Sequence, residues 1–98
     1  MDIKIVREET ASTNYFEAYA KETLSKYFEK YPFVESIKVF FRGKNHPYKK
    51  VKLQVRLKGK DVFVEARGDR HDRAIDAASH KLRTQVEKYK TKRYKKVS

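Results

Sequence analysis

Alternation of apolar and polar residues, sustained over three successive segments, constrains the fold of this chain more than any other feature. In residues 37–41, 51–57 and 62–66, every second residue is apolar. A period of two places successive side chains on opposite faces of a β-strand, so the pattern predicts three strands, each with one apolar and one polar face. Residues 43–48 and the tight-turn signal Gly59-Lys60-Asp61 separate the segments. We therefore expect an antiparallel meander.

The segments that flank the meander predict one more strand and two helices. Residues 2–7 alternate around Ile3 and Ile5 and indicate a short first strand. A helix capped by Thr13, or by Asn14 with Glu17, should end at Tyr31 because Pro32 follows. Its helical period gives a core stripe of Phe16, Ala20, Thr23, Leu24, Tyr27 and Tyr31. A second helix, capped by Asp69 or Asp72 after Gly68, has a core stripe of Ile75, Ala78, Leu82, Val86 and Tyr89.

The resulting order, β-α-β-β-β-α, predicts a two-layer α/β (α+β) sandwich. A right-handed crossover places the first helix on one face of a four-stranded sheet. The apolar stripe of the second helix must pack on the same face, and the opposite face stays open. At 98 residues we expect a single domain, residues 1–98, with a basic tail from about residue 90.

The charge of the chain indicates a polyanionic partner. The formal net charge is +12, and it is uneven: residues 1–30 hold five Lys/Arg against six Asp/Glu, and residues 31–60 hold nine against one. Such a field attracts nucleic acid. The chain has no cysteine and no apolar run that approaches the roughly 18 residues of a membrane span. We therefore expect a cytoplasmic protein without a membrane partner.

The open sheet face should display a basic surface with two aromatic rings. Its cations can neutralise phosphates, or they can simply keep an exposed sheet soluble. Phe40 and Phe63 can stack on unpaired bases, or they can pack under a loop or a partner protein. The side chains expected on this face are Lys38, Phe40, Arg42, Lys50, Lys52, Gln54, Arg56, Phe63 and Arg67.

The second helix carries a basic row beside its core stripe. Lys81, Gln85, Lys88 and Lys92 fall at i, i+4, i+7 and i+11 and so share one face. This face is either merely solvated or in contact with RNA, and its continuation through Lys90, Arg93, Lys95 and Lys96 favours phosphate contact. On the opposite flank, the i,i+4 spacings of Asp76 with His80 and of Arg83 with Glu87 are typical of solvent-side ion pairs.

Enzymatic and metal-binding patterns are weak in this sequence. His46 lies in a turn, His71 at a helix start and His80 on a charged flank, with no cysteine nucleophile and no phosphate-cradling glycine motif. Asp72, Asp76 and His80 share a helical face and could hold a metal, but surface pairing is the commoner use of such residues. We expect no catalysis, no cofactor, no metal site and no small-molecule substrate.

The region around the second helix resembles the ribosome hibernation-promoting factor (ribosome-associated inhibitor) family. The resemblance rests on Glu65-Ala-Arg-Gly-Asp69, Ala74-Ile75-Asp76, Lys81-Leu82, Gln85 and Lys88-Tyr-Lys90, together with the element order. It implies a fold similar to the double-stranded-RNA-binding domain. It also implies a short-form protein that sits at the decoding region of the small ribosomal subunit, contacts rRNA, and blocks mRNA and tRNA. Any pairing of ribosomes would then need a separate dimerising protein.

These considerations give a set of candidate RNA-binding residues and three alternative functions. The candidate rRNA contacts are Lys50, Lys52, Arg56, Lys81, Gln85, Lys88, Lys90, Lys92 and Arg93, with Phe40 and Phe63 as candidates for base stacking. The main alternative is a general double-stranded-RNA-binding protein, since the same fold and charge would serve it. An adaptor that presents Phe40 and Phe63 to a protein, or a nuclease, are more distant alternatives.

Overall fold

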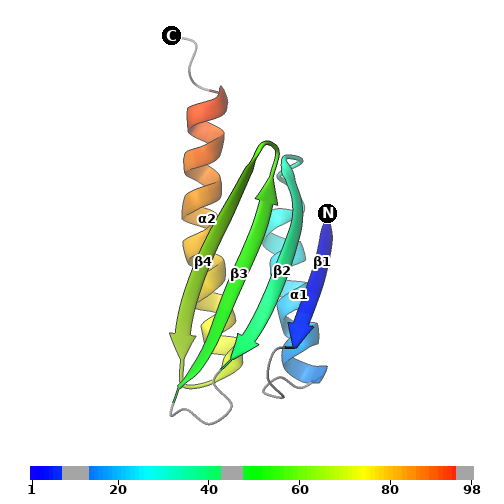
Figure 1. Cartoon of the computed structure of the whole chain (residues 1–98), viewed down its shortest axis with the longest axis vertical. Helices are drawn as coiled ribbons and strands as arrows, with labels where there is room; N and C mark the ends of the chain where they lie inside the picture. Colours follow the sequence, from blue (N-terminus) through cyan, green and yellow to red (C-terminus); the bar gives the residue numbers. More distant parts are fainter. Residues whose placement is uncertain (8–13, 43–47, 95–98) are drawn as a thin grey trace.

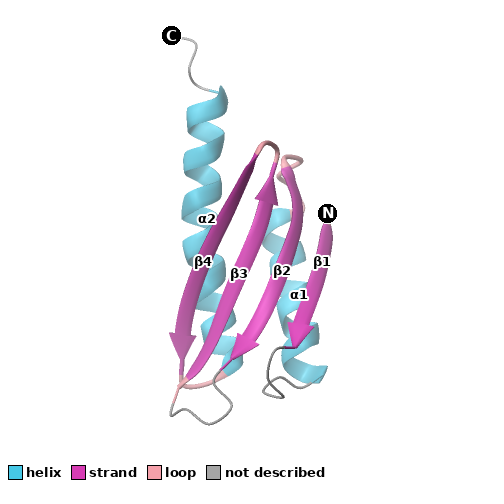
Figure 2. Cartoon of the chain, in the orientation of Figure 1, coloured by secondary structure: helices cyan, strands magenta, loops and turns pink. Residues whose placement is uncertain are grey.

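The elements of the protein follow the predicted order. The computed structural model describes residues 1–7, 14–42 and 48–94. Its elements are β1 (Asp2–Arg7), α1 (Asn14–Phe28), β2 (Val34–Arg42), β3 (Lys49–Leu57), β4 (Lys60–Gly68) and α2 (His71–Tyr94). Both helices lie on one face of the sheet (Figure 1), and in the described parts of the chain no helix covers the other face (Figure 2). The predicted two-layer α+β sandwich is confirmed.

The sheet has the strand order β1-β2-β3-β4. β1 pairs with β2 in parallel, which requires the α1 crossover, whereas β2, β3 and β4 form the predicted antiparallel meander. Val39 faces Leu53, and Leu53 faces Val64. These residues are buried on the helix side, while Phe63 of β4 is 57% exposed on the other. The predicted register is therefore correct, since a slip of one residue would bury Phe63.

Two glycines shape the ends of β4. Leu57 pairs with Lys60, so the β3–β4 turn consists of Lys58 and Gly59, one residue earlier than predicted. Gly59 has φ +79°, a left-handed conformation that favours glycine. At the other end, a Cβ on Gly68 would lie 2.9 Å from the backbone nitrogen of Ala74. Glycine at this position lets β4 pass closely under α2. The predicted turn between β2 and β3 lies largely outside the described residues.

The helix α1 differs from the prediction at its C-terminal end. It begins at Asn14, with Thr13 outside the described residues, and it ends at Phe28 rather than at Tyr31. The Tyr31 N–H bonds the Phe28 carbonyl in a tight turn that places Tyr31 in the core. Tyr27, predicted to be in the core, is 42% exposed, and Phe28 is buried instead. Phe28 lies one full turn after Leu24 and therefore continues the buried stripe.

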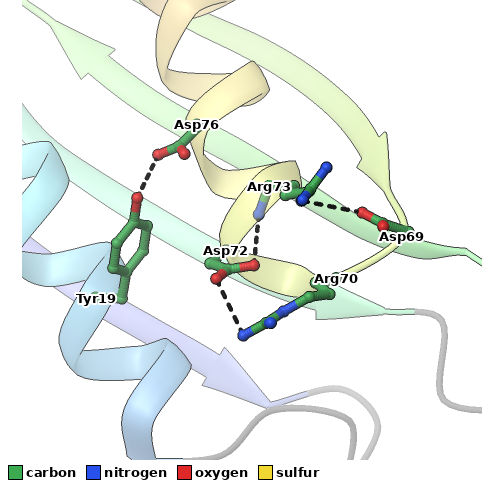
Figure 3. Close-up of polar contacts among 6 residues, drawn as sticks. All are labelled: Tyr19, Asp69, Arg70, Asp72, Arg73 and Asp76. Carbon is green, nitrogen blue, oxygen red and sulfur yellow. Dashed lines mark hydrogen bonds and ion pairs between the residues drawn. The ribbon is translucent and has the colours of Figure 1, made fainter.

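The helix α2 has the predicted buried stripe, with Tyr89 partly buried at its end. Neither predicted aspartate is the N-cap, because the helix begins at His71, directly after Arg70. Asp72 lies in the first turn, where its carboxylate accepts a hydrogen bond from the Arg73 N–H (2.9 Å). Ion pairs join Arg70 to Asp72 and Arg73 to Asp69 (Figure 3). A negative charge in the first turn still matches the helix dipole.

Candidate nucleic-acid interface

The predicted basic row of α2 lies on the side of the helix that faces β4. Lys81, Gln85, Lys88 and Lys92 are all exposed, and we refer to these four residues as the lysine flank. The Nζ of Lys81 donates a hydrogen bond to the backbone carbonyl of Glu65 in β4 (2.8 Å). This bond joins α2 to β4, and it uses part of the donor capacity of Lys81 within the protein.

The rest of the lysine flank meets the β3–β4 turn. A groove of about 560 Å³ lies between them, lined by Lys58, Gly59, Lys60, Gln85, Lys88, Tyr89 and Lys92. We refer to it as the lysine groove. The hydroxyl of Tyr89 donates a hydrogen bond to the Lys58 carbonyl (2.5 Å), which ties the turn to the helix. Beyond this point α2 continues past the end of the sheet (Figure 1).

The electrostatics of the lysine groove fit an anion. Four ammonium groups border it, two from the β3–β4 hairpin (Lys58 and Lys60) and two from the helix (Lys88 and Lys92), and none of the described lining residues is acidic. An ammonium is a compact point charge with three donors, well suited to phosphate oxygens. Successive phosphates of a nucleic-acid backbone can therefore be neutralised across the two elements, with release of counterions. The groove can bind RNA through its backbone.

The opposite flank of α2 uses its charges inside the protein. Asp76 accepts a hydrogen bond from the hydroxyl of Tyr19 in α1 (2.7 Å; Figure 3), which raises the pKa of Tyr19 to about 12. Glu87 accepts a hydrogen bond from the Tyr31 hydroxyl, which lowers the pKa of Glu87 and raises that of Tyr31. The expected pair of Asp76 with His80 does not occur among the described ion pairs, because Asp76 bonds Tyr19 instead. The expected pairing of Arg83 with Glu87 is partly present, since the Arg83 charge also lowers the Glu87 pKa. Asp76 and Glu87 tie α2 to α1 and to the segment after it.

The Arg83 guanidinium completes this flank. It lies 6.0 Å from the ring centroid of Tyr27, the α1 residue that the sequence wrongly placed in the core. A cation over an aromatic face is attracted by the ring quadrupole, so the contact stabilises both exposed side chains. Tyr27 is thus part of the contact between the outer surfaces of the two helices.

The open sheet face carries the predicted cations, but also acids that the prediction omitted. Lys50 pairs with Glu65 (3.8 Å), and Arg56 pairs with Glu35 and Asp61 (3.8 Å each). Such exposed pairs reduce the charge that these two cations offer to RNA. The omission has a simple cause: Asp61 and Glu65 alternate with Val62, Val64 and Ala66 and therefore share the face of Phe63.

Lys52 is placed differently from the other sheet cations. Its ammonium lies 5.7 Å from the ring centroid of Phe40 and 5.7 Å from that of Phe63. It makes no ion pair with any of the described acids. Phe40, Lys52, Arg56 and Phe63 all point away from the helices, as predicted.

The structure thus separates the predicted RNA-binding residues into groups. Gln85, Lys88 and Lys92 meet in the lysine groove, while Lys50, Lys52 and Arg56 lie on the sheet face. Lys90 is exposed near Glu87, where its charge adds to the hydrogen bond from Tyr31 in lowering the Glu87 pKa. The side chain of Arg93, together with Lys95 and Lys96, lies outside the described residues. The sequence reading missed Lys58 and Lys60, although two lysines around a turn glycine were a visible signal.

Two other sequence-based considerations concern metals and membranes. Within residues 1–7, 14–42 and 48–94, no group of three or more His, Cys, Asp or Glu side chains is arranged to hold a metal ion, including Asp72, Asp76 and His80. Asp72 contacts Arg70, and Asp76 contacts Tyr19. None of the described helices combines the length and apolar character needed to cross a membrane.

Comparisons with known proteins agree with this geometry. The family model described as Sigma 54 modulation protein / S30EA ribosomal protein matches residues 3–94. A ribosomal subunit interface protein from Coxiella burnetii has the same fold, with a TM-score of 0.81 and 24% identity over 93% of this chain and 99% of that one. The N-terminal domain of Protein Y from Thermus thermophilus gives a TM-score of 0.74 and 28% identity, over 91% of this chain and 99% of that one. No curated protein sequence gives a significant match.

Proposed function

We propose that this chain, which belongs to the Sigma 54 modulation protein / S30EA ribosomal protein family, is a cytoplasmic ribosome hibernation factor. In this proposal it acts as one ribosome-binding unit on the small subunit. There it occupies the decoding region, blocks mRNA and tRNA, and keeps the ribosome translationally inactive. It acts by occupancy, without catalysis or a cofactor. A separate ribosome-dimerising protein is proposed as a further partner.

The observation that carries this proposal is the lysine groove. Lys58, Lys60, Lys88 and Lys92 surround one hollow, and the Tyr89–Lys58 hydrogen bond holds the turn and the helix together. Because this bond joins the turn to the helix, the backbone positions from which the four cations extend are set before a phosphate backbone binds. In the ribosome these phosphates would belong to rRNA. Lys50, Lys52, Arg56, Lys90 and Arg93 are proposed as further contacts.

The family description and the name of one structural neighbour favour a ribosomal partner over free RNA. The family model is described as Sigma 54 modulation protein / S30EA ribosomal protein, and the neighbour from Coxiella burnetii as a ribosomal subunit interface protein. The alternative is a general double-stranded-RNA-binding protein, because a basic groove on this fold would also serve a duplex. The two differ in what competes for the site, since a duplex binder reads the shape of about 16 base pairs.

A competition experiment tests the proposal. Labelled protein is bound to purified small subunits and challenged with mRNA plus tRNA, or with a free RNA duplex of about 16 base pairs. We expect mRNA and tRNA to displace the protein and the duplex to have little effect. Displacement by the duplex alone, or no binding to small subunits on a sucrose gradient, would overturn the proposal.

A salt series measures how many phosphates are involved. Each neutralised phosphate contributes about 0.7 to 0.9 to the slope of log affinity against log salt concentration. The four lysines of the groove alone should then contribute a slope of roughly −2.8 to −3.6, to which the further contacts would add. A nearly flat series would mean that the positive charge of the chain is not used for RNA.

A further inference from the structure

A lysine between two phenylalanine rings occupies the middle of the uncovered sheet face. Lys52 of β3 faces Phe40 of β2 directly, and Phe63 of β4 faces the next residue on the same side of β3, Gln54. The Lys52 ammonium is 5.7 Å from the centroid of each ring. We refer to Phe40, Lys52 and Phe63 as the aromatic–lysine cluster. It lies on the side of the sheet away from both helices and is not part of the lysine groove.

The exposure of Phe63 has no explanation in the fold itself. Its side chain is 57% exposed, more than that of any other phenylalanine whose exposure the structure describes. Single exposed apolar residues are common on protein surfaces, so exposure alone would indicate nothing. Here, however, the Lys52 ammonium lies over the Phe63 ring and over the Phe40 ring. Glu65, the direct cross-strand neighbour of Lys52, forms its ion pair with Lys50.

We propose that the aromatic–lysine cluster binds an unpaired nucleotide of RNA, with the base stacked on Phe63 and an adjacent phosphate neutralised by Lys52. An aromatic ring presents a π-face that any base can use, and a neighbouring cation binds the phosphate that must follow the base. The Gln54 amide, opposite Phe63 in the register, has donors and acceptors for a base edge. Lys38, on the other side of Gln54, adds a second exposed cation.

A second cation–ring pair, between Arg67 of β4 and Tyr48 just before β3, extends this surface in one direction. The Arg67 guanidinium lies 5.4 Å from the ring centroid of Tyr48, which is 50% exposed. Arg67 follows Phe63 by four residues, roughly 13 Å along a strand at about 3.3 Å per residue. An extended single strand that runs along the face would thus pass from one pair to the other. Duplex RNA cannot use either ring, because its bases are already stacked.

RNA fits this face better than a protein partner does. A protein that covered Phe63 would also bury the Lys52 ammonium, which costs free energy unless the partner supplies an acid. A nucleotide supplies both an aromatic ring and a negative charge. The inference extends the proposed function, since rRNA would provide the unpaired base, but it can be tested on free RNA and therefore fails independently of ribosome binding.

The test compares single-stranded RNA with and without bases. The full chain is titrated with an oligonucleotide of about 8 nucleotides and with an abasic backbone of equal length. We expect the intact oligonucleotide to bind about 5- to 160-fold more tightly, the range set by stacking of one base. Phe63→Leu keeps an apolar side chain but removes the ring, so this ratio should fall several-fold. Tyr15→Leu is the matched control, because Tyr15 is 59% exposed on α1, and it should keep the ratio.

A fluorescent variant reports stacking directly. The chain contains no tryptophan, so Phe63→Trp introduces a single indole at the proposed site. We expect the intact oligonucleotide to quench its fluorescence and the abasic backbone, which brings charge without bases, to leave it largely unchanged. Equal affinity of the wild-type protein for both oligonucleotides would overturn the inference and favour a protein partner or a merely solvated face. So would quenching by both, whereas binding to small subunits would remain as a separate result.

Discussion

The two flanks of α2 carry similar numbers of charged residues but use them in opposite ways. On the flank towards α1, Asp76 and Glu87 are bonded to tyrosine hydroxyls, and Arg83 lies against the Tyr27 ring. On the flank towards β4, Lys88 and Lys92 face the lysine groove together with the β3–β4 turn. The first flank holds the helices together, and the second is available to a ligand.

This difference shows why net charge alone is a poor guide to function. A carboxylate or guanidinium engaged by a neighbouring side chain contributes to the fold, and it must give up that contact to bind RNA. Lysines that border a groove lined by other lysines are stabilised when an anion binds, because the anion reduces the repulsion between them. We therefore expect substitutions on the β4-side flank to affect binding, and those on the α1-side flank to affect stability.

The largest effect should come from the double substitution Lys88→Gln and Lys92→Gln. It removes two charge-assisted contacts from the groove, and we expect ribosome affinity to fall about 10- to 100-fold. The free energy of unfolding should change by less than about 0.5 kcal/mol, because both residues are exposed. Binding is measured by co-sedimentation with small subunits, and stability by urea titration.

Charge itself needs a control in this experiment. Lys21→Gln with Lys26→Gln removes the same two charges from exposed positions on α1. If long-range attraction dominates, both double variants will bind equally weakly. A large defect confined to the Lys88 and Lys92 variant would identify the groove as a local contact site.

The strands were predictable from sequence because period-two alternation reports directly which side chains face the core. The core side of α1 was harder to predict, because Tyr27 and Phe28 are adjacent, apolar and about 100° apart around the helix. Which of them is buried depends on where the sheet lies. The tyrosine–carboxylate bonds were missed since their partners, Tyr19 with Asp76 and Tyr31 with Glu87, are more than 50 residues apart in sequence.

Only the helix side of the lysine groove could be predicted from the sequence. The helical spacing of Gln85, Lys88 and Lys92 reveals a shared face without any knowledge of the fold. That Lys58 and Lys60 meet this face depends on how far the β3–β4 hairpin reaches along α2, which is a tertiary property. The sequence could name the turn, but not the element that it would contact.

The next largest effect should come from Gly59→Ala, which strains the turn that supplies half of the groove. The positive φ of Gly59 should cost an alanine about 1 to 2 kcal/mol. We expect thermal unfolding to shift downwards by a few degrees and ribosome affinity to fall several-fold, since Lys58 and Lys60 lose their fixed positions. Steric overlap would not explain this loss of stability, because no atom lies within 4 Å of the added Cβ. An alanine variant with unchanged stability and affinity would contradict the role given to this turn.

A smaller effect is expected on the other flank, from Tyr19→Phe. This change removes the hydrogen bond to Asp76, and we expect a loss of about 0.5 to 1 kcal/mol in the free energy of unfolding. The folded pKa of Tyr19, about 12, exceeds the ordinary value of 10.0. The stabilisation should therefore be present below pH 10.0 and disappear as the pH rises through about 12. Ribosome affinity near neutral pH should be unchanged. A loss of affinity would contradict the assignment of this flank to stability rather than to binding.

The smallest expected effect is a loss of stability in mild acid. It depends on a residue at the start of α2 that belongs to neither flank. His71, at the start of α2, is buried, lies edge-on against the Phe16 and Phe41 rings, and contacts the Arg42 carbonyl through Nε2 (3.1 Å). Burial lowers its pKa below the ordinary 6.5, an effect to which the Lys49 charge adds and which the Arg42 carbonyl and Asp72 oppose.

Below pH 6.5 the unfolded chain therefore binds a proton at His71 that the folded chain still excludes. Stability should fall as the pH decreases from 6.5 through the lower folded pKa of His71. Urea titrations between about pH 7 and pH 5 measure this slope. His71→Phe keeps a ring between Phe16 and Phe41 but cannot be protonated, so its slope should be flatter. His80→Gln alters an exposed histidine and should retain the wild-type slope. If His80→Gln flattens it instead, the acid response originates on the α1-side flank rather than at the base of the helix.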